Sequence, residues 1–223
     1  MFKFEKYRHY FKAYDKELAG LSPTSILEIG VHSGGSLYYW KERFPTAKIL
    51  GLDIDPNCIG AEARGITVRI GDQSDKDYIE DLARIYGPFD LIVDDGGHWP
   101  YMQKASFEVL WCFLNPNGVY VIEDTHTSYW MKWGGFRRGF YRYIDKMIDQ
   151  LHGYWNNNKT QITISLDRIS IYDSIVFLHK SAVSKEKPEL LSQGEGDCRK
   201  DTSIKSTAIP VLKWRIKRLF KTR

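Results

Sequence analysis

The chain has 223 residues and a formal net charge of +4, and this charge is unevenly distributed. Residues 204–223 carry seven basic groups and no acidic group, so the tail contributes +7 and the rest of the chain is at −3. A surface that follows nucleic-acid phosphates needs its basic groups on the folded body, so this distribution argues against a general nucleic-acid binder. Hydrophobic residues at 43% and aromatic residues at 14% argue against a disordered chain.

Length and cysteine content restrict the class of protein further. A chain of this length fits one domain, and no apolar run approaches the ~20 residues that a membrane span needs. The N-terminus has charges throughout and no apolar stretch of the secretory-signal type. The three cysteines, Cys58, Cys112 and Cys198, are widely spaced and form no disulfide framework and no paired metal site. We therefore expect a reducing, cytoplasmic setting.

Residues 1–20 predict a charged helix whose apolar positions are aromatic, and short apolar runs then alternate with stretches of helical spacing. We expect strands at 25–30, 48–54, 66–72, 89–95 and 119–124. We expect helices at 37–45, 75–87, 102–118 and 139–155, the third of which ends at the turn signal Asn-Pro-Asn-Gly. This alternation predicts βαβ units, a parallel sheet and right-handed crossovers. Residues 161–180 contain two β-type runs that meet at Tyr172-Asp173-Ser174, which predicts an antiparallel hairpin at the end of the sheet.

A glycine-rich turn follows the first predicted strand. Ligands of open α/β sheets bind beyond the carboxyl ends of the strands, and this strand ends in Glu28-Ile29-Gly30 before Gly34-Gly35-Ser36. Glycines let the backbone pass close to a ligand, and the following helix offers free N–H groups. The spacing is not GxGxxG, so a pyrophosphate cradle is the weaker interpretation.

Acidic residues follow the second and third strands. Asp53 ends the second strand, where it is placed to accept hydrogen bonds from a ribose diol. Asp72 follows the third strand, where it could accept a hydrogen bond from an adenine amino group. Either residue could instead cap a helix or lie in a solvated loop. The ordered set across three strands favours a nucleoside pocket.

The motifs ExGxxxG after the first strand, an acid after the second and GDxxD after the third resemble class I S-adenosylmethionine-dependent methyltransferases, over about residues 20–181. The resemblance implies a Rossmann-like three-layer α/β sandwich whose mostly parallel seven-stranded sheet ends in an antiparallel hairpin. It implies S-adenosylmethionine as cofactor, with Asp53 on the ribose and Asp72 near the adenine. Glu28, Gly30 and Gly34 are expected around the methionine and ribose portions. The full expected cofactor-binding set is Glu28, Gly30, Gly34, Ser36, Asp53, Asp72, Gln73 and Asp94.

Carboxylates also end the fourth and fifth strands, in the stretches DDGGH (94–98) and EDTH (123–126). Neighbouring strands lie ~4.8 Å apart, so Asp95 is expected to meet Glu123 and Asp124. Carboxylates this close repel one another unless they are protonated or bound to a cation. Oxygen ligands without cysteine favour Mg²⁺, Mn²⁺ or Ca²⁺ over zinc. The alternative is that one or two of these acids cap helices or pair with arginine.

DDGGH followed by VIEDTHTSYW resembles the metal-dependent sugar O-methyltransferases that act on macrolide sugars and other glycosides, and the related cephalosporin-hydroxylase-type family. The resemblance implies that Asp95, Glu123 and Asp124 hold Mg²⁺ and that His98 is the base that deprotonates a sugar hydroxyl. His126 is the alternative base, or a hydrogen-bonding neighbour of the acceptor. We see no N-terminal auxiliary domain of the kind that some relatives use. Oligomerisation, with a homo-oligomer among the alternatives, and substrate closure are therefore expected to differ.

Residues 129–143 are rich in aromatic residues and contain Gly134-Gly135, which predicts a lid that stacks on sugar faces. Tyr129 and Trp130 follow the metal acids and, with His126, are the expected contacts to the sugar-containing acceptor. Arg137 and Arg138 could meet a phosphate on a sugar nucleotide, although solvated arginines are commoner.

Other functions remain open. A catechol-type O-methyltransferase uses similar metal chemistry on a different acceptor. A hydroxylase-like relative would need an iron site, and no 2-His-1-carboxylate triad is evident in the sequence. A catalytically silent binding module of a glycan-assembly complex is the alternative from another class, and the complete set of acids argues against it.

The C-terminal residues predict a basic amphipathic helix. One face carries Leu212, Ile216, Leu219 and Phe220, and the opposite face carries Lys213, Lys217, Arg218 and Lys221. This pattern is typical of a helix on an anionic membrane surface, with a partner-docking helix or a disordered end as alternatives. It predicts peripheral contact with the inner face of the membrane. The expected regions are a helix at 1–20, the methyltransferase domain at 21–182, a flexible linker at 183–209 and the tail helix at 210–223.

Overall fold

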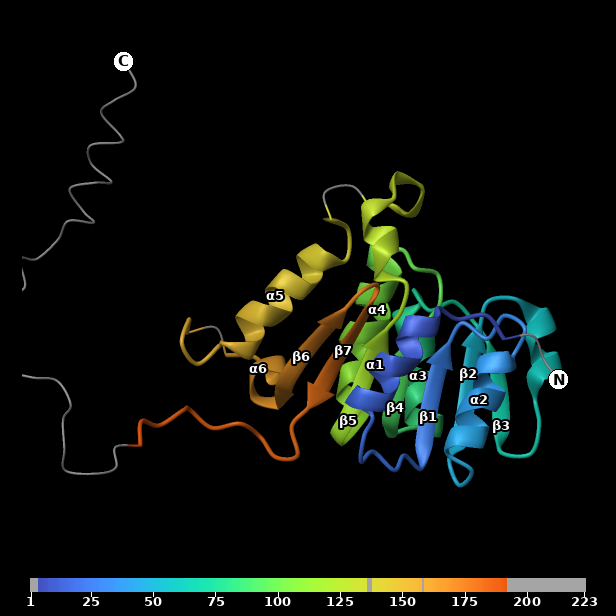
Figure 1. Cartoon of the computed structure of the whole chain (residues 1–223), viewed down its shortest axis with the longest axis horizontal. Coiled ribbons are helices and arrows are strands. Elements are labelled where there is room, and N and C mark those ends of the chain that lie inside the picture. The colour runs from blue at the N-terminus through green and yellow to red at the C-terminus, as the bar shows by residue number, and fades with distance from the viewer. Residues whose placement is uncertain (1–3, 136–137, 158, 192–223) are drawn as a thin grey trace, which may run out of the picture. The chain divides into compact units, whose positions relative to one another are not determined.

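The computed structural model describes residues 4–135, 138–157 and 159–191. They contain a seven-stranded sheet with the order β3-β2-β1-β4-β5-β7-β6 and helices on both of its faces (Figure 1). The strands are β1 (Ser25–Ile29), β2 (Lys48–Asp53), β3 (Ile66–Ile70), β4 (Phe89–Asp94), β5 (Leu114–Ile122), β6 (Leu166–Tyr172) and β7 (Ile175–Lys180). This architecture confirms the Rossmann-like sandwich that the sequence predicts.

The direction of the strands brings the predicted site residues to one edge of the sheet. The first five strands are parallel, and β7 runs antiparallel to both β5 and β6. At the carboxyl edge, Ile29 lies between Leu52 and Asp94, and Asp94 pairs with Ile122. The residues that follow these positions therefore leave the sheet side by side, as parallel strands require.

Two apolar clusters lie on opposite faces of the sheet. The helices are α1 (Arg8–Glu17), α2 (Gly35–Arg43), α3 (Lys76–Tyr86), α4 (Pro100–Leu110), α5 (Tyr141–Leu151) and α6 (Gln161–Ser165). Short 3₁₀ helices span Pro56–Ala61, Trp111–Phe113, Thr125–Tyr129 and Met131–Trp133. Side chains of α1 and α2 share one cluster with the strands, and side chains of α3, α4 and α5 share the other. Burial on both faces explains why the central strands are almost continuously apolar.

Two predicted elements were wrong in part. The helix expected at 102–118 ends at Leu110, because Leu114 already pairs with Phe89 and β5 begins there; the Asn-Pro-Asn-Gly turn forms an irregularity in that strand. The expected hairpin is present as β6 and β7, but the first five residues of its first run, 161–165, form helix α6 instead of strand. Thr160 starts this helix with a capping box, in which its side chain and that of Thr163 satisfy each other's backbone N–H groups. This local cap overrides the β-type composition of the segment.

The predicted regions at the two ends of the domain are described in part by the structure. Helix α1 is shorter than the expected 1–20, and its buried side chains Tyr10, Ala13 and Tyr14 pack into the same cluster as α2. Met1–Pro188 forms one compact unit, and residues 183–191 contain no helix or strand. The rest of the predicted linker and the whole predicted tail helix lie outside the described residues.

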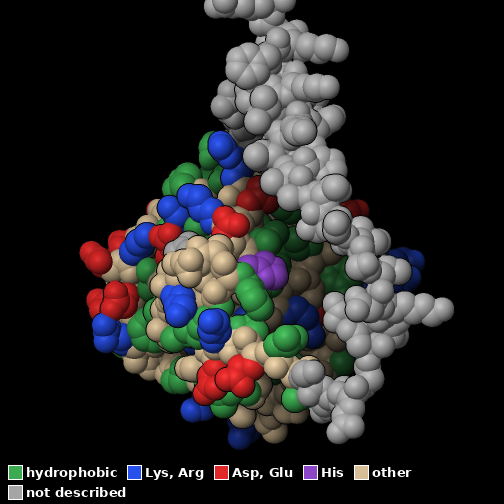
Figure 2. Space-filling model, turned by 90° about the vertical axis from the view of Figure 1, so that its left-hand side faces the viewer, with side chains coloured by type: hydrophobic (Ala, Val, Ile, Leu, Met, Phe, Trp, Pro, Cys, Tyr) green, Lys and Arg blue, Asp and Glu red, His purple; other side chains and the backbone are tan. Residues whose placement is uncertain are grey.

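The described surface is mixed in charge on the face drawn in Figure 2, where basic and acidic side chains lie interspersed around apolar ones on the part that grey atoms leave visible. Among the described residues, no helix has both the length and the apolar character needed to cross a bilayer.

Candidate active site

A cavity of about 580 Å³ opens beyond the carboxyl ends of β1, β2 and β4. Part of its wall is formed by glycines, at positions 30, 35, 71, 96 and 97. The predicted cofactor residues that line it are Gly30, Ser36, Asp53, Asp72 and Gln73. Ligand pockets of about 300–1,000 Å³ hold molecules of drug size, so a nucleoside cofactor fits this volume.

Gly30 allows the turns after β1 and β4 to touch. Its φ is +90°, and a Cβ at this position would lie 2.0 Å from the backbone oxygen of Asp95. The backbone N–H of Asp95 donates to the oxygen of Ile29 at 2.9 Å, which joins the same two turns. A side chain at position 30 would therefore push the cofactor loop away from the acidic end of β4.

Asp53 anchors the loop that follows β1. Its Oδ2 accepts from the backbone N–H groups of Val31 and His32 at 2.7 and 2.9 Å, and its Oδ1 accepts from Asp55 N at 2.9 Å. Burial opposes ionisation, but these three backbone donors outweigh it and lower the pKa of Asp53. Asp53 thus stabilises this loop, a role that differs from the helix cap or solvated position considered from the sequence. It also lines the cavity, and its ribose contact stays a prediction.

The polar floor of the cavity involves Gln73 and Asp94. Gln73 accepts from Gly97 N at 2.6 Å and donates to Asp94 Oδ1 at 3.1 Å. Asp94 is fully buried and also accepts from Ser106 Oγ at 2.6 Å; burial raises its pKa although these hydrogen bonds act in the opposite direction. Asp94, Glu28 and Gly34 do not line the cavity, so their predicted contacts with the cofactor are unsupported by position and stay predictions.

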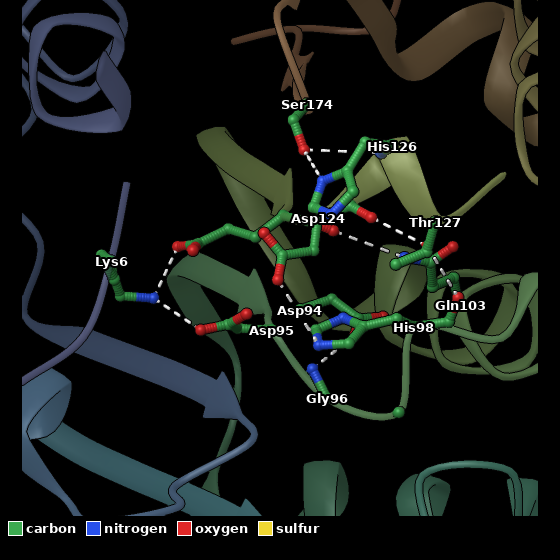
Figure 3. Close-up of polar contacts among 12 residues, drawn as sticks. Lys6, Asp94, Asp95, Gly96, His98, Gln103, Asp124, His126, Thr127 and Ser174 are labelled. Carbon is green, nitrogen blue, oxygen red and sulfur yellow. Dashed lines mark hydrogen bonds and ion pairs between the residues drawn. The ribbon is translucent and has the colours of Figure 1, made fainter. Parts of the chain in front are cut away.

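A second cavity, of about 390 Å³, lies against the carboxylates. Asp95, Glu123 and Asp124 line it together with residues of the N-terminal segment, and both cavities share Phe4, Glu5, Lys6 and Asp95 as walls. The predicted convergence of acids from the ends of β4 and β5 is therefore present in the structure (Figure 3).

A buried lysine neutralises part of this acidic cluster. Lys6 Nζ lies 2.7 Å from Asp95 Oδ2, 2.7 Å from Glu123 Oε1 and 3.4 Å from Glu28 Oε1, and its side chain is 2% exposed (Figure 3). Burial opposes its charge, but the surrounding carboxylates raise its pKa well above the usual value. Burial and then the charge of Asp95 raise the pKa of Glu123 to about 8. Burial raises the pKa of Glu28 to about 7.

Two tyrosines of α1 reach the same carboxylates. Tyr10 donates to Asp124 Oδ1 at 2.7 Å, and Tyr14 forms a very short hydrogen bond to Glu123 Oε1. Both rings are buried, which raises the pKa of each phenol above its usual value. Both hydroxyls therefore stay protonated and act as donors.

His98 lines the first cavity and lies close to Asp124, which lines the second. Its Nε2 lies 3.6 Å from Asp124 Oδ2, and one donor atom from each of Asp95, His98 and Asp124 lies within 4.8 Å of the others (Figure 3). His98 Nδ1 is buried and has no hydrogen-bond partner among the described residues. The carboxylates of Asp95 and Asp124, with Glu123 adjacent, are an oxygen donor set that suits Mg²⁺ or Mn²⁺, and His98 lies beside them.

The residues predicted to contact the sugar acceptor follow Glu123 and Asp124 along the chain. His126 shares a very short hydrogen bond with Ser174, and its ring lies 4.6 Å from that of Trp130 and 5.7 Å from that of Tyr7. Trp130 and Tyr129 are 51% and 62% exposed. Neither lines the two cavities, and their acceptor contacts stay predictions. Of the two predicted phosphate contacts, Arg138 pairs with Asp145 at 3.4 Å and Arg137 lies outside the described residues.

The sequence analysis missed three residues of this site: Lys6, Tyr10 and Tyr14, which contact the acids. Trp133, from the segment 129–143 that was predicted as a lid, lies edge-on to His98 at 5.8 Å. The three missed residues are spaced by four, so they recur on one side of a helical segment and place polar tips there. That spacing is the signal that could have revealed them.

Comparison with known proteins identifies the fold of this site. Residues 27–125 match a family described as "Methyltransferase domain". These residues form a methyltransferase domain. The chain is also similar to the mycinamicin VI 2''-O-methyltransferase of Micromonospora griseorubida, at 40% identity over 58% of this chain and 33% of that enzyme. It is 35% identical to an 8-demethyl-8-alpha-L-rhamnosyl tetracenomycin-C 2'-O-methyltransferase of Streptomyces olivaceus, over 64% of this chain and 41% of the enzyme.

Solved structures give the same result for the methyltransferase domain. The MycE methyltransferase of the mycinamycin biosynthetic pathway, in complex with Mg and SAH, superposes with a TM-score of 0.74 at 30% identity. The match covers 80% of this chain and 51% of MycE. The Podospora anserina methyltransferase PaMTH1, at 17% identity and a TM-score of 0.55, shares the fold. The chain spans a third to about half of the length of these sugar O-methyltransferases.

Proposed function

We propose that this chain is an S-adenosylmethionine-dependent, Mg²⁺-assisted O-methyltransferase that methylates a sugar hydroxyl of a glycoside or glycan. One observation carries the proposal: a cavity of nucleoside size, walled in part by glycines, shares Asp95 and Lys6 with a second cavity that Asp95, Glu123 and Asp124 line. A methyl donor in the first cavity and an acceptor in the second would meet at the end of β4.

The similarity to sugar O-methyltransferases supports the acceptor class. The relatives methylate sugars of macrolide and tetracenomycin compounds by name, and one MycE structure contains Mg, SAH and mycinamycin VI together. Because this chain spans only part of those enzymes, its acceptor is proposed only as a sugar-bearing molecule. We extend the proposal to polysaccharide intermediates because the basic tail predicts binding to the membrane surface.

The residues expected to hold the metal are Asp95, Glu123 and Asp124. Bound Mg²⁺ lowers the pKa of an oxygen that it holds and fixes the orientation of that oxygen. Asp95 and Asp124 face the second cavity, and Glu123 lies between Lys6 and Tyr14 at its inner wall. Lys6 and one divalent cation would together reduce the charge of the four carboxylates, with Glu28 included, from −4 to −1, which would reduce their mutual repulsion.

His98 is the proposed general base. Its Nε2 would accept the hydroxyl proton while the sugar oxygen forms a bond to the methyl carbon and the carbon–sulfur bond breaks, with the electron pair remaining on sulfur. Asp124, 3.6 Å from Nε2, stabilises the imidazolium that results. Alignment of oxygen, methyl and sulfur is the largest contribution, since well-oriented pairs gain up to about 7–11 kcal/mol.

A mass-spectrometric assay tests the proposed reaction. The protein is incubated with S-adenosylmethionine and a panel of glycosides and catechols, with excess Mg²⁺ or with EDTA. We expect a mass gain of one methyl on glycosides that EDTA abolishes. Methylation of catechols alone would assign the catechol-type reaction. No methylation and no cofactor binding would reject the enzyme and favour a binding module.

A histidine substitution tests the base. His98→Ala at saturating Mg²⁺ should lower turnover about 10²–10⁴-fold, the usual contribution of a general base. His152→Ala removes an exposed histidine at the end of α5 and is the matched control. Near-normal turnover of His98→Ala would remove His98 from this role.

The proposed location at the cytoplasmic face of the membrane depends on the basic tail. Deletion of 204–223 should abolish binding to anionic liposomes and leave turnover on soluble acceptors unchanged. Liposome binding equal to that of the full chain would reject this location. Size-exclusion chromatography with light scattering decides between a monomer and the homo-oligomer that the sequence leaves open.

A further inference from the structure

We infer that Lys6, Tyr10 and Tyr14 are positioning residues of the metal site, which hold the carboxylates of Asp95, Glu123 and Asp124 in the orientation that binds a divalent cation. The inference rests on the proposed Mg²⁺-assisted function and adds to it a set of residues that lies outside the methyltransferase match at 27–125.

Each acid offers one oxygen to the N-terminal residues. Asp95 uses Oδ2 for Lys6, and Glu123 uses Oε1 for both Lys6 and Tyr14. Asp124 uses Oδ1 for Tyr10, while its Oδ2 faces His98. Among the described residues, no hydrogen bond reaches Oδ1 of Asp95 or Oε2 of Glu123. The arrangement is the same in all three acids: one oxygen is fixed, and the other is left for a cation or its waters.

Tyr10 also fixes the backbone of Asp124. Asp124 has a φ of +53°, in the left-handed region, and its backbone N–H donates to Tyr10 Oη at 3.2 Å. The same hydroxyl lies 2.8 Å from Ser174 Oγ, which in turn bonds to His126. A residue without glycine's freedom keeps this conformation only where its surroundings hold it, so Tyr10 secures both the carboxylate and the turn that presents it.

The three residues suit a permanent role because they are buried. Tyr10 and Tyr14 are 1% and 0% exposed, and the Lys6 side chain is 2% exposed. Tyr14 packs edge-on against Trp40 and Phe177, so its ring is fixed before its hydroxyl meets Glu123. Groups that orient metal ligands commonly change metal affinity about 10–100-fold when they are removed.

Mn²⁺ binding, measured by electron paramagnetic resonance without methyl donor or acceptor, tests the inference. Tyr14→Phe and Tyr10→Phe remove only a hydroxyl and leave the charge of the site unchanged. Each should weaken Mn²⁺ binding about 10–100-fold and leave the affinity for SAH within about twofold of wild type. The affinity for SAH is a readout that general loosening of the domain would also change.

Tyr172→Phe is the matched control. Tyr172 donates to Glu17 Oε1 of α1 at 2.5 Å. The substitution therefore removes a tyrosine–carboxylate hydrogen bond that involves the same helix but lies away from the three acids. Its Mn²⁺ affinity should equal that of wild type. An equal loss in the control, or wild-type affinity in both test variants, would overturn the inference while wild-type Mn²⁺ binding kept the proposed function intact. Absence of Mn²⁺ binding in the wild-type protein would overturn both.

Discussion

The cofactor side and the carboxylate side of the site are built in different ways. On the cofactor side, Asp53 accepts hydrogen bonds from Val31 and His32, 22 and 21 residues before it, and glycines that follow neighbouring strands form part of the cavity wall. On the carboxylate side, Lys6 meets Asp95 and Glu123 across 89 and 117 residues of chain, and the contacts are between charged side chains. The first is a local backbone cradle, and the second depends on the whole domain being folded.

This difference determines which substitutions should weaken each side of the site. The cofactor side is sensitive to added volume, because its turns approach closely at Gly30. A buried charged cluster is sensitive to the loss of one partner, since the remaining charge is then left unpaired. The two sides touch at Gly30 and Asp95, so substitutions there should affect both, and substitutions farther away should affect only one.

Gly30→Ala should have the largest effect, because it disrupts the contact between the two sides. The added Cβ would lie 2.0 Å from the backbone oxygen of Asp95, and alanine disfavours a φ of +90°. We expect a loss of ~4 kcal/mol or more in the free energy of unfolding, measured by urea denaturation. Gly60→Ala is the control, since nothing lies within 4 Å of its added Cβ. A loss as small as that of the control would show that the turns can separate without cost.

Lys6→Met should affect the carboxylate side next most strongly. It leaves the buried carboxylates of Glu28 and Glu123 without their cation, and breaking a buried ion pair typically costs about 3–5 kcal/mol. Saturating Mn²⁺ should recover part of the loss, because it supplies positive charge to the same cluster. The control Arg84→Met breaks an exposed pair with Glu80 and should cost at most about 0.5 kcal/mol. Equal losses of unfolding free energy in the two variants, measured by urea denaturation, would show that the ion pairs of Lys6 contribute no more than an exposed pair.

On both sides the sequence predicts the residues that follow the strands, and it misses the N-terminal residues that contact the acids. Asp53 and Gly30 were found because strand ends are marked by apolar runs, and whatever follows a parallel strand lies at one edge. Asp95, Glu123 and Asp124 were found by this rule as well. Lys6 and Tyr14 were not, because their spacing of four places them on one side of a helical segment but does not indicate where that side packs. Likewise, 161–165 has strand-like composition, and only the pairing of Thr160 with Thr163 makes it helical.

Ser106→Ala should have an intermediate effect on the floor between the two sides. Ser106 donates to Asp94 Oδ2 at 2.6 Å, and Asp94 is fully buried. Hydrogen bonds to buried charged groups contribute about 1.5–3 kcal/mol, so unfolding should become easier by that amount. Ser74→Ala is the control, because Ser74 makes the same bond to the less buried Asp72 at 2.8 Å. An equal and small loss in both would show that Asp94 is neutral in the folded protein.

Asp53→Asn should have the smallest effect on stability and should separate the two sides most clearly. The amide keeps the shape of the side chain, but one of its ends is a donor and cannot accept from the N–H groups of Val31, His32 or Asp55. The affinity for SAH, measured by calorimetry, should fall roughly tenfold, as expected for one lost charge-assisted hydrogen bond. The affinity for Mn²⁺ should not change, and Asp75→Asn, at the cap of α3, should change neither.

The acid stability of the Asp53→Asn variant independently tests the ionisation of Asp53. Because the folded pKa of Asp53 lies below its unfolded value, its contribution is complete above the unfolded pKa of about 3.9 and is lost as the pH falls through the folded pKa. Wild type should therefore lose more stability than Asp53→Asn when the pH is lowered from about 5 to 2. Identical acid profiles would show that the three N–H groups do not favour the charged form. A parallel fall in Mn²⁺ affinity would instead mean that the loop after β1 also supports the carboxylates, and the two sides would then act as one structural unit.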